Sequence, residues 1–166
     1  MSWTLSGVAA ATDLDGLPTS VVERHGVAPL SASVHPNATT IIDHIVVATP
    51  DIDRTISAFV AVGVEPRRER VGGSPSMPMR QVFLRMGEVI IEVVGPPTPP
   101  TDATARARSA SFWGLAFTCA DIDACARLLG GDGMGSVRDA VQKGRKIGSL
   151  RHECFGVSVP TVFMTP

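Results

Sequence analysis

The sequence predicts an α+β fold made of two copies of a βαβββ module, and three observations predict it. The triplet Asp-Ile-Asp occurs at 51–53 and again at 121–123, each time after an apolar run and before a helical pattern. The closing pairs at 95–96 and 165–166 are separated by the same offset of 70 residues. Sixteen glycines and thirteen prolines among 166 residues favour short strands and turns over long helices.

The first module is expected over residues 41–97. It begins with a β-branched run at 41–47, which predicts a strand. Asp51 is a suitable N-cap for the helix that follows, and Gly63 is a suitable end for it. Three strands complete the module, at 66–71, 79–84 and 89–94, with a glycine-rich loop at 72–76.

The second module is expected over residues 110–166 and repeats the same order. A strand at 112–118 precedes a helix at 121–129, and further strands are expected at 137–141, 147–152 and 159–164. Residues 98–109 are proline-rich and then polar, which is typical of a linker.

Residues 1–40 stand outside both modules. The segment HGVAP at 25–29 echoes VGVEP at 62–66, so a degenerate half-module is one interpretation. The alternative is an N-terminal extension that adds strands to the edge of a sheet.

Composition limits the classes of function. A net charge of −1 provides no basic surplus for nucleic acid, and aromatic residues are only 5% of the chain. No apolar run approaches the roughly 18 residues that a membrane span needs, and residues 1–16 lack the features of a secretory signal. The three cysteines, 119, 125 and 154, have no CxxC spacing, which favours reduced core thiols in a cytoplasmic protein.

The order of elements, beginning IDHIVVATPDID and closing GEVIIEVVGP, resembles the vicinal oxygen chelate superfamily over residues 41–166. That group includes glyoxalase I, extradiol dioxygenases, fosfomycin-resistance proteins and bleomycin-binding proteins. The resemblance implies two modules whose sheets curve round one cleft for a small organic molecule. In the metal-using members, ligands come from the first and last strands of each module.

His44 and Glu92 are the candidate catalytic and metal-binding residues that this resemblance implies, because they lie in the first and last strands of the first module. A carboxylate within VIIEVV needs a partner, which a metal, an arginine or a protonated group can supply. His and Glu from two strands of one sheet suit zinc, iron, nickel or manganese. The alternative for each residue is a structural role in the sheet.

The second module departs from the metal-binding pattern. The offset of 70 carries His44 onto Gly114 and Glu92 onto Val162, which offer no ligating side chain. A divalent-metal site would therefore be incomplete, since catalytic sites normally have three protein ligands. His152, expected on the penultimate strand, could complete a 2-His-1-carboxylate set if it faced the cleft.

Six further residues are candidates for the substrate cleft. An arginine there could bind an anionic substrate or simply pair with a glutamate, and a glycine in a strand often marks the close approach of a ligand. A tryptophan beside that glycine could form an apolar wall or belong to the core. The six residues are Arg80, Gln81, Trp113, Gly114, Arg151 and Val162.

Three functions follow from these residues. The first is a glyoxalase-like lyase, isomerase or dioxygenase that uses an incomplete metal site. The second is a metal-free protein that sequesters a small molecule such as a drug. The third is a metal-independent isomerase, lyase or hydrolase in which His44 and Glu92 act as an acid–base pair. A homodimer is a possible assembly, because the exposed edge strands of two copies could pair with each other.

Overall fold

The computed structural model describes residues 1–8, 13–23 and 35–166. The chain divides into two compact units. The first unit comprises Met1–Gly26 and Val46–Trp113, and the second comprises Val27–Ile45 and Gly114–Pro166. Strands β3 (Thr39–Ala48) and β7 (Ser111–Cys119) contribute residues to both.

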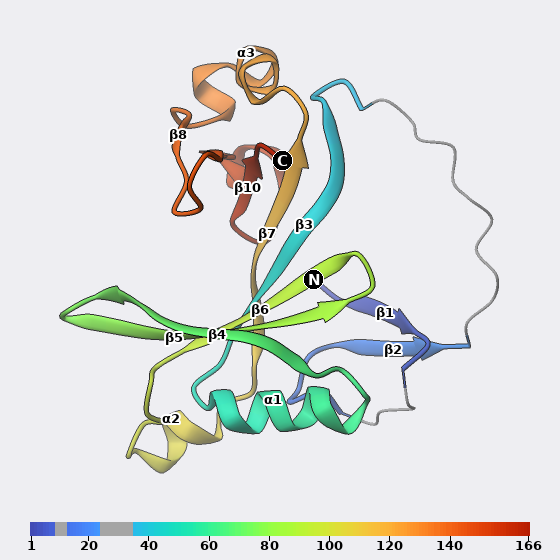
Figure 1. Ribbon diagram of the computed structural model, residues 1–166, viewed down its shortest axis with the longest axis vertical. Coiled ribbons are helices and arrows are strands. Elements are labelled where there is room, and N and C mark those ends of the chain that lie inside the picture. Colours follow the sequence, from blue (N-terminus) through green and yellow to red (C-terminus); the bar gives the residue numbers. More distant parts are fainter. Residues whose placement is uncertain (9–12, 24–34) are drawn as a thin grey trace. The chain divides into compact units, whose positions relative to one another are not determined.

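From β3 onward the chain shows the expected order of strand, helix and three strands, and all of these elements after β3 belong to the first unit (Figure 1). After β3 come α1 (Ile52–Ala61), β4 (Pro66–Ser74), β5 (Met77–Met86) and β6 (Val89–Gly95). The hydrogen-bonded order is β4-β5-β6-β3, and both β4–β5 and β5–β6 are antiparallel. A short helix, α2 (Ala103–Ala107), lies within the segment expected to be a linker.

Helix α1 begins and ends where the sequence predicts. The Oδ1 atom of Asp51 accepts a hydrogen bond from the backbone N–H of Arg54 at 3.2 Å, which satisfies one of the free N–H groups of the first turn. Gly63 follows the helix with φ of 85°, a left-handed conformation that favours glycine. Ile52 and Phe59 are 2% and 0% exposed, so the helix buries one apolar stripe in the first unit.

The two faces of the first sheet differ in composition. Val82, Leu84, Ile91 and Val93 are at most 2% exposed and share one face, because Val82 pairs with Val93 and Leu84 with Ile91. The opposite face carries the side chains that alternate with these. We call it the Glu92 face, and its members on β5 and β6 include Met79, Gln81, Phe83, Glu92 and Val94.

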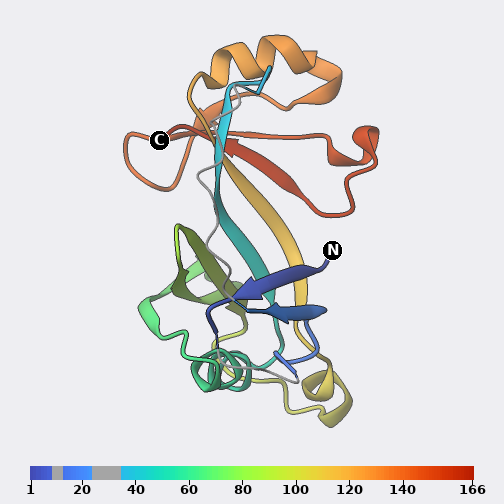
Figure 2. The same cartoon turned by 90° about the vertical axis from the view of Figure 1, so that its right-hand side faces the viewer.

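The N-terminal segment belongs to the first unit. Strands β1 (Trp3–Ser6) and β2 (Thr19–Val22) pair with each other in parallel, as Figures 1 and 2 show, and form a separate two-stranded sheet. They therefore do not extend an edge of the larger sheet. The Trp3 ring packs edge-on against Phe112, with centroids 4.8 Å apart. The echo at 25–29 lies outside the described residues.

The second unit repeats the pattern with shorter strands. After β7 come α3 (Ile122–Gly133), β8 (Arg138–Asp139), β9 (Lys146–Ser149), a 3₁₀ helix η1 (His152–Phe155) and β10 (Thr161–Met164). The strand order is β7-β10-β9-β8, with β10 parallel to β7. The core includes Cys119, Ile122, Cys125, Met134 and Phe163.

The two helix caps confirm the internal repeat. Asp121 accepts a hydrogen bond from the backbone N–H of Ala124 at 2.8 Å, and its φ of −135° and ψ of 92° equal those of Asp51. Helix α3 is longer than expected but is interrupted at Gly130, where φ is 67°. The α+β class and both βαβββ orders are thus confirmed.

Three sequence-based expectations need correction. The strand expected at 147–152 ends at Ser149, and His152 begins η1 instead. The strand expected at 137–141 contains only Arg138 and Asp139. The loop expected at 72–76 is mostly strand, because Gly72 and Gly73 still pair with Met79 and Pro78 of β5.

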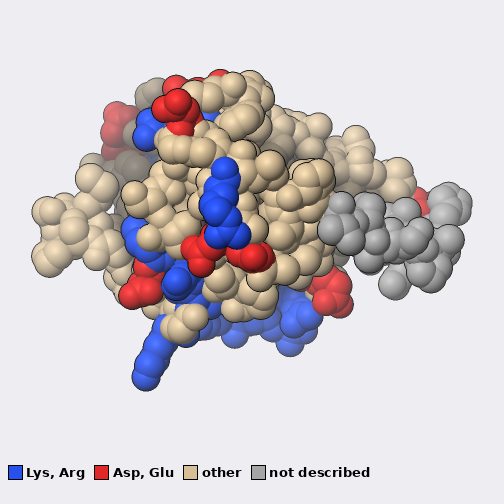
Figure 3. All heavy atoms as spheres, turned by 90° about the horizontal axis from the view of Figure 1, so that it is seen from above, with Lys and Arg blue, Asp and Glu red and all other residues tan. Residues whose placement is uncertain are grey.

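The described residues were also compared with the expectations about membrane spans and surface charge. None of their helices is both long and apolar enough to span a bilayer. On the face in Figure 3, basic and acidic side chains are interspersed among neutral ones, as the net charge of −1 leads one to expect.

Candidate functional site

A pocket of about 550 Å³ lies within the first unit, where β3 and β6 end and β5 and β7 begin. Most of its lining residues are apolar, and they include Met77, Met79, Val94, Pro96 and Trp113. Its polar lining residues are Thr49, Arg108, Ser109 and Ser111. An apolar cavity of this size with a few polar groups is typical of sites for small organic molecules.

Trp113 was expected to line a substrate cleft, and the structure places it on the wall of this pocket. Its side chain is 51% exposed, although tryptophan is usually well buried. The indole therefore offers an accessible apolar surface beside Met77, which is itself 71% exposed.

Glu92 lies on the Glu92 face of β6, two residues before Val94, which lines the pocket. The Oε1 atom of Glu92 accepts a hydrogen bond from Gln81 Nε2 at 2.6 Å. The Oε1 atom of Gln81 in turn accepts one from Arg70 Nε at 2.6 Å. This chain across three strands fixes the orientation of the Gln81 amide and supplies the half-buried Glu92 carboxylate with a donor.

Two arginines on the same face add positive charge beside this chain. The guanidinium carbons of Arg68 and Arg70 lie 6.0 and 5.6 Å from the centroid of the Phe83 ring. These distances fit cation–π contacts. Phe83 pairs with Glu92 across β5 and β6, so the cationic groups and the carboxylate belong to one face.

His44 lies in the second unit and is held by its neighbour in sequence. The Nδ1 atom of His44 donates to Asp43 Oδ1 at 2.7 Å. Arg145 Nη2 and Thr118 Oγ1 donate to the other Asp43 oxygen at 2.6 and 3.1 Å. Because a carboxylate oxygen can only accept, Nδ1 is the ring nitrogen of His44 that carries the proton of this bond.

The charge on Asp43 is stabilised in the folded state. Burial by itself would raise the pKa of Asp43, but the hydrogen bonds from Arg145 and His44 lower it below its ordinary value. Asp43 therefore stays ionised over the usual range of pH. Neither Asp43 nor Arg145 was singled out from the sequence, because they lie 102 residues apart and no spacing rule joins them.

The remaining cleft candidates have other surroundings. Arg80 lies on the opposite face of β5 from Gln81, and its guanidinium pairs with Asp53 at 2.6 Å and Glu69 at 2.7 Å. Gly114 is a buried residue of β7, Arg151 is exposed at the start of η1, and Val162 pairs with Ala116 and Ser149 inside the second sheet.

His152 lies in η1 and not on the penultimate strand, so the expectation that placed it on that strand was wrong. Backbone hydrogen bonds from Cys154 to the Arg151 carbonyl and from Gly156 to the Glu153 carbonyl form the 3₁₀ helix instead. The Nδ1 atom of His152 donates to the Val157 carbonyl at 2.9 Å, which anchors the ring locally.

The described residues do not fit the expected metal site. Within 1–8, 13–23 and 35–166, no three His, Cys, Asp or Glu side chains are grouped so as to hold a metal ion. Gly114 and Val162 cannot ligate through their side chains, so the second unit supplies no counterpart to His44 and Glu92 at the positions related by the offset of 70. The described side chains thus do not supply the three protein ligands that a catalytic metal site normally has.

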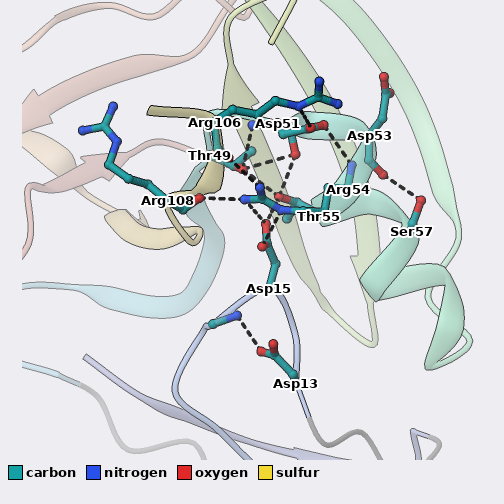
Figure 4. A network of polar contacts seen from close by, with 11 residues as sticks. Asp13, Asp15, Thr49, Asp51, Asp53, Arg54, Thr55, Ser57, Arg106 and Arg108 are labelled. Atoms are coloured by element: carbon teal, nitrogen blue, oxygen red, sulfur yellow. Dashed lines mark hydrogen bonds and ion pairs between the residues drawn. The ribbon is translucent and has the colours of Figure 1, made fainter. Parts of the chain in front are cut away.

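A polar network around Asp15 fixes one wall of the pocket (Figure 4). The Asp15 carboxylate is 8% exposed and accepts from Arg54 Nε at 2.7 Å and from the Thr55 hydroxyl. The terminal nitrogens of Arg54 donate to the carbonyls of Arg106 and Arg108, each at 2.7 Å. The network thus ties the N-terminal segment and α1 to the backbone that carries Arg108.

The comparisons with known proteins agree with this fold. A methylmalonyl-CoA epimerase from Mycobacterium tuberculosis superposes with a TM-score of 0.57 at 20% identity, over 82% of this chain and 92% of that one. A Streptomyces coelicolor methylmalonyl-CoA epimerase in complex with 2-nitronate-propionyl-CoA gives 0.54 at 23% identity, over 76% and 97%. A mutant 4-hydroxymandelate synthase from Streptomyces coelicolor gives 0.56 at 16%, over 75% and 47%.

At these identities the structural likeness shows the fold alone. A comparison of the sequence with curated proteins gave no match. The family model described as glyoxalase/bleomycin resistance protein/dioxygenase superfamily matches residues 43–155, which is more than half of the chain. The chain therefore belongs to the glyoxalase/bleomycin resistance protein/dioxygenase superfamily.

Proposed function

We propose that this protein binds a small organic molecule in the pocket of the first unit and that Glu92 transfers a proton to or from it. The observation that carries the proposal is the pocket of about 550 Å³, with Trp113, Met77 and Met79 in its wall. Its volume falls within the range of roughly 300–1,000 Å³ that is usual for small-molecule sites.

The position of Glu92 favours acid–base chemistry over simple sequestration. It shares a sheet face with Val94 and Met79, which line the pocket, and Gln81 Nε2 holds one of its oxygens. A carboxylate oriented in this way can take a proton from a carbon next to a carbonyl group and return it to the same carbon. Such a transfer leaves the composition of the substrate unchanged and exchanges the proton on that carbon with solvent, whereas inversion of the carbon would need a second group that delivers a proton to the opposite face.

The neighbouring epimerases suggest which substrates to try. Their names specify methylmalonyl-CoA, and one was solved with 2-nitronate-propionyl-CoA. We propose an acyl thioester or a related carbonyl compound as the substrate class, and methylmalonyl-CoA as the first probe. No metal takes part in the proposed step, so exchange should be indifferent to a chelator such as EDTA.

Deuterium exchange tests the proposal. The protein is incubated with methylmalonyl-CoA in D₂O, and incorporation of deuterium is followed by mass spectrometry. Glu92→Gln should lower the exchange rate by about 100-fold or more, as expected for loss of a general base. The matched control is Glu88→Gln in the neighbouring turn, where the carboxylate is 91% exposed.

Binding is measured separately, so that the enzyme and the sequestering protein can be distinguished. The chain has two tryptophans, and a Trp3→Phe background leaves Trp113 as the only reporter in the wall of the pocket. Binding that changes Trp113 fluorescence without exchange would support a metal-free binding protein. Exchange that survives Glu92→Gln would overturn the role of Glu92.

His44 is a second candidate for proton transfer, in the second unit. The observation that favours it is the Asp43 carboxylate, which fixes the imidazole through Nδ1 at 2.7 Å. The same exchange assay with His44→Asn tests it, and a rate equal to that of the unaltered protein would reject it.

A further inference from the structure

We infer that the pocket of the first unit selects ligands that carry a negative charge, and that Arg108 makes this selection. The inference rests on the proposed function, since it concerns the ligand of the same pocket. It adds the chemical class of the ligand, which is an apolar molecule with an anionic group such as a carboxylate, and the residue that recognises that group.

Among the described residues that line the pocket, Arg108 has the one ionisable side chain. The other polar lining groups are the hydroxyls of Thr49, Ser109 and Ser111, which are neutral. A ligand in the pocket therefore meets an apolar wall and a single positive charge. An anionic group on the ligand compensates that charge, whereas a cationic group is repelled by it.

The charge of Arg108 is not neutralised by a carboxylate in the described part of the chain. Its side chain makes one long hydrogen bond there, from Nε to the Ala105 carbonyl at 3.4 Å. Nearby arginines are different, because Arg54 pairs with Asp15 and Arg106 pairs with Asp51. The terminal nitrogens of Arg108 thus remain donors for a ligand, and their planar geometry suits a carboxylate or sulfonate.

The backbone beneath Arg108 is held in place before any ligand arrives. Its carbonyl accepts from Arg54 Nη2 at 2.7 Å, and Arg54 is anchored by the buried Asp15 carboxylate. Figure 4 shows the Arg108 side chain extending away from this network while its carbonyl takes part in it. Because the backbone is already fixed, binding has to order only the Arg108 side chain, which limits the conformational entropy that is lost.

Two fluorescent probes that differ by one anionic sulfonate group test the inference. 1-Anilinonaphthalene-8-sulfonate is anionic, and N-phenyl-1-naphthylamine is the same aromatic amine without the sulfonate. Titrations use the Trp3→Phe protein, and energy transfer from Trp113 reports occupancy of the pocket. We expect the anionic probe to bind about 5- to 10-fold more tightly, since an exposed charge-assisted hydrogen bond lies at the low end of its usual range.

Variants assign this preference to Arg108. Arg108→Gln should weaken the anionic probe to the affinity of the neutral one and leave the neutral probe unchanged, whereas Arg108→Lys should keep most of the preference. The substituted side chain leaves the backbone carbonyl and its bond to Arg54 in place. The matched control is Arg85→Gln, where the side chain is 60% exposed and bonds to the turn at Gly87 and Glu88. Circular dichroism confirms that each variant is folded.

The outcomes separate this inference from the proposed function. Equal affinity of the two probes, or a loss of both in Arg108→Gln, would overturn the anion preference while leaving the pocket as a binding site. Absence of energy transfer from Trp113 with either probe would overturn the proposed function and this inference together.

Discussion

The two units share the same helix cap but differ in the lengths of their later strands and in the residues that those strands carry. Both helices start at an aspartate cap with identical φ and ψ, yet the strands that follow have 9, 10 and 7 residues in the first unit and 2, 4 and 4 in the second. The pocket and Glu92 belong to the first unit. The second carries Val162 at the position equivalent to Glu92. The two modules thus share the same helix cap, whereas the pocket described above lies in the first unit.

The largest expected difference between the two modules is the stability lost when an apolar side chain that packs the helix against its sheet is removed. Phe59 and Leu129 are equivalent under the offset of 70, but Phe59 is 0% exposed whereas Leu129 is only partly buried. Phe59→Ala should lower the free energy of unfolding by about 3–5 kcal/mol, and Leu129→Ala by about 1–2 kcal/mol. Urea titrations followed by circular dichroism measure both. Equal losses would show that the two helices are anchored alike.

A smaller difference is expected at the caps. Asp51 is 6% exposed and also pairs with Arg106 at 3.1 Å, whereas Asp121 is exposed. Asp51→Ala should cost about 2 kcal/mol and Asp121→Ala about 0.5–1 kcal/mol, because the first variant loses an ion pair together with the cap. Thermal unfolding of the two variants compares them. A larger loss at Asp121 would contradict the burial argument.

The smallest effect concerns pH in the second unit. Because the pKa of Asp43 is lower in the folded state than its ordinary value of 3.8, its stabilising contribution is complete above that value and is lost as pH falls through the folded pKa. Asp43→Asn should cost about 1 kcal/mol at pH 7 and less at pH 3. Urea unfolding at the two pH values tests this. A cost that is independent of pH would rule out the ionised carboxylate as its source.

The repeat made most of the fold predictable, since the caps and apolar periods recur at one offset. Predictions from local sequence patterns were wrong where the backbone hydrogen bonding of the folded chain differs from what the pattern suggests. Gly72 and Gly73 suggest a loop, but Gly73 adopts φ of 84° while β4 and β5 continue to pair around it. The stretch ending at His152 alternates like a strand but closes into a 3₁₀ turn, which the left-handed Gly156 ends.

The candidate site was harder to predict than the fold. Glu92 could be selected because it occupies a position that the superfamily resemblance implies, and Trp113 and Gln81 because they lie on strands expected to border the cleft. Arg108 could not, because its role depends on packing of the linker against α1 and on Asp15, which is 39 residues from Arg54 in sequence. No period or motif links those segments, so their contacts with the backbone of Arg108 could not be read from the sequence.

The carbonyl of Arg108 has a consequence for the N-terminus of the chain. Arg54 binds that carbonyl and the Asp15 carboxylate at the same time. If the Asp15 anchor favours the binding of a ligand at Arg108, thermodynamic reciprocity requires the ligand to strengthen the anchor by the same free energy. Ligand binding would then protect residues 13–23 from proteolysis, and the N-terminal segment would report on the occupancy of a pocket to which it contributes no lining residue.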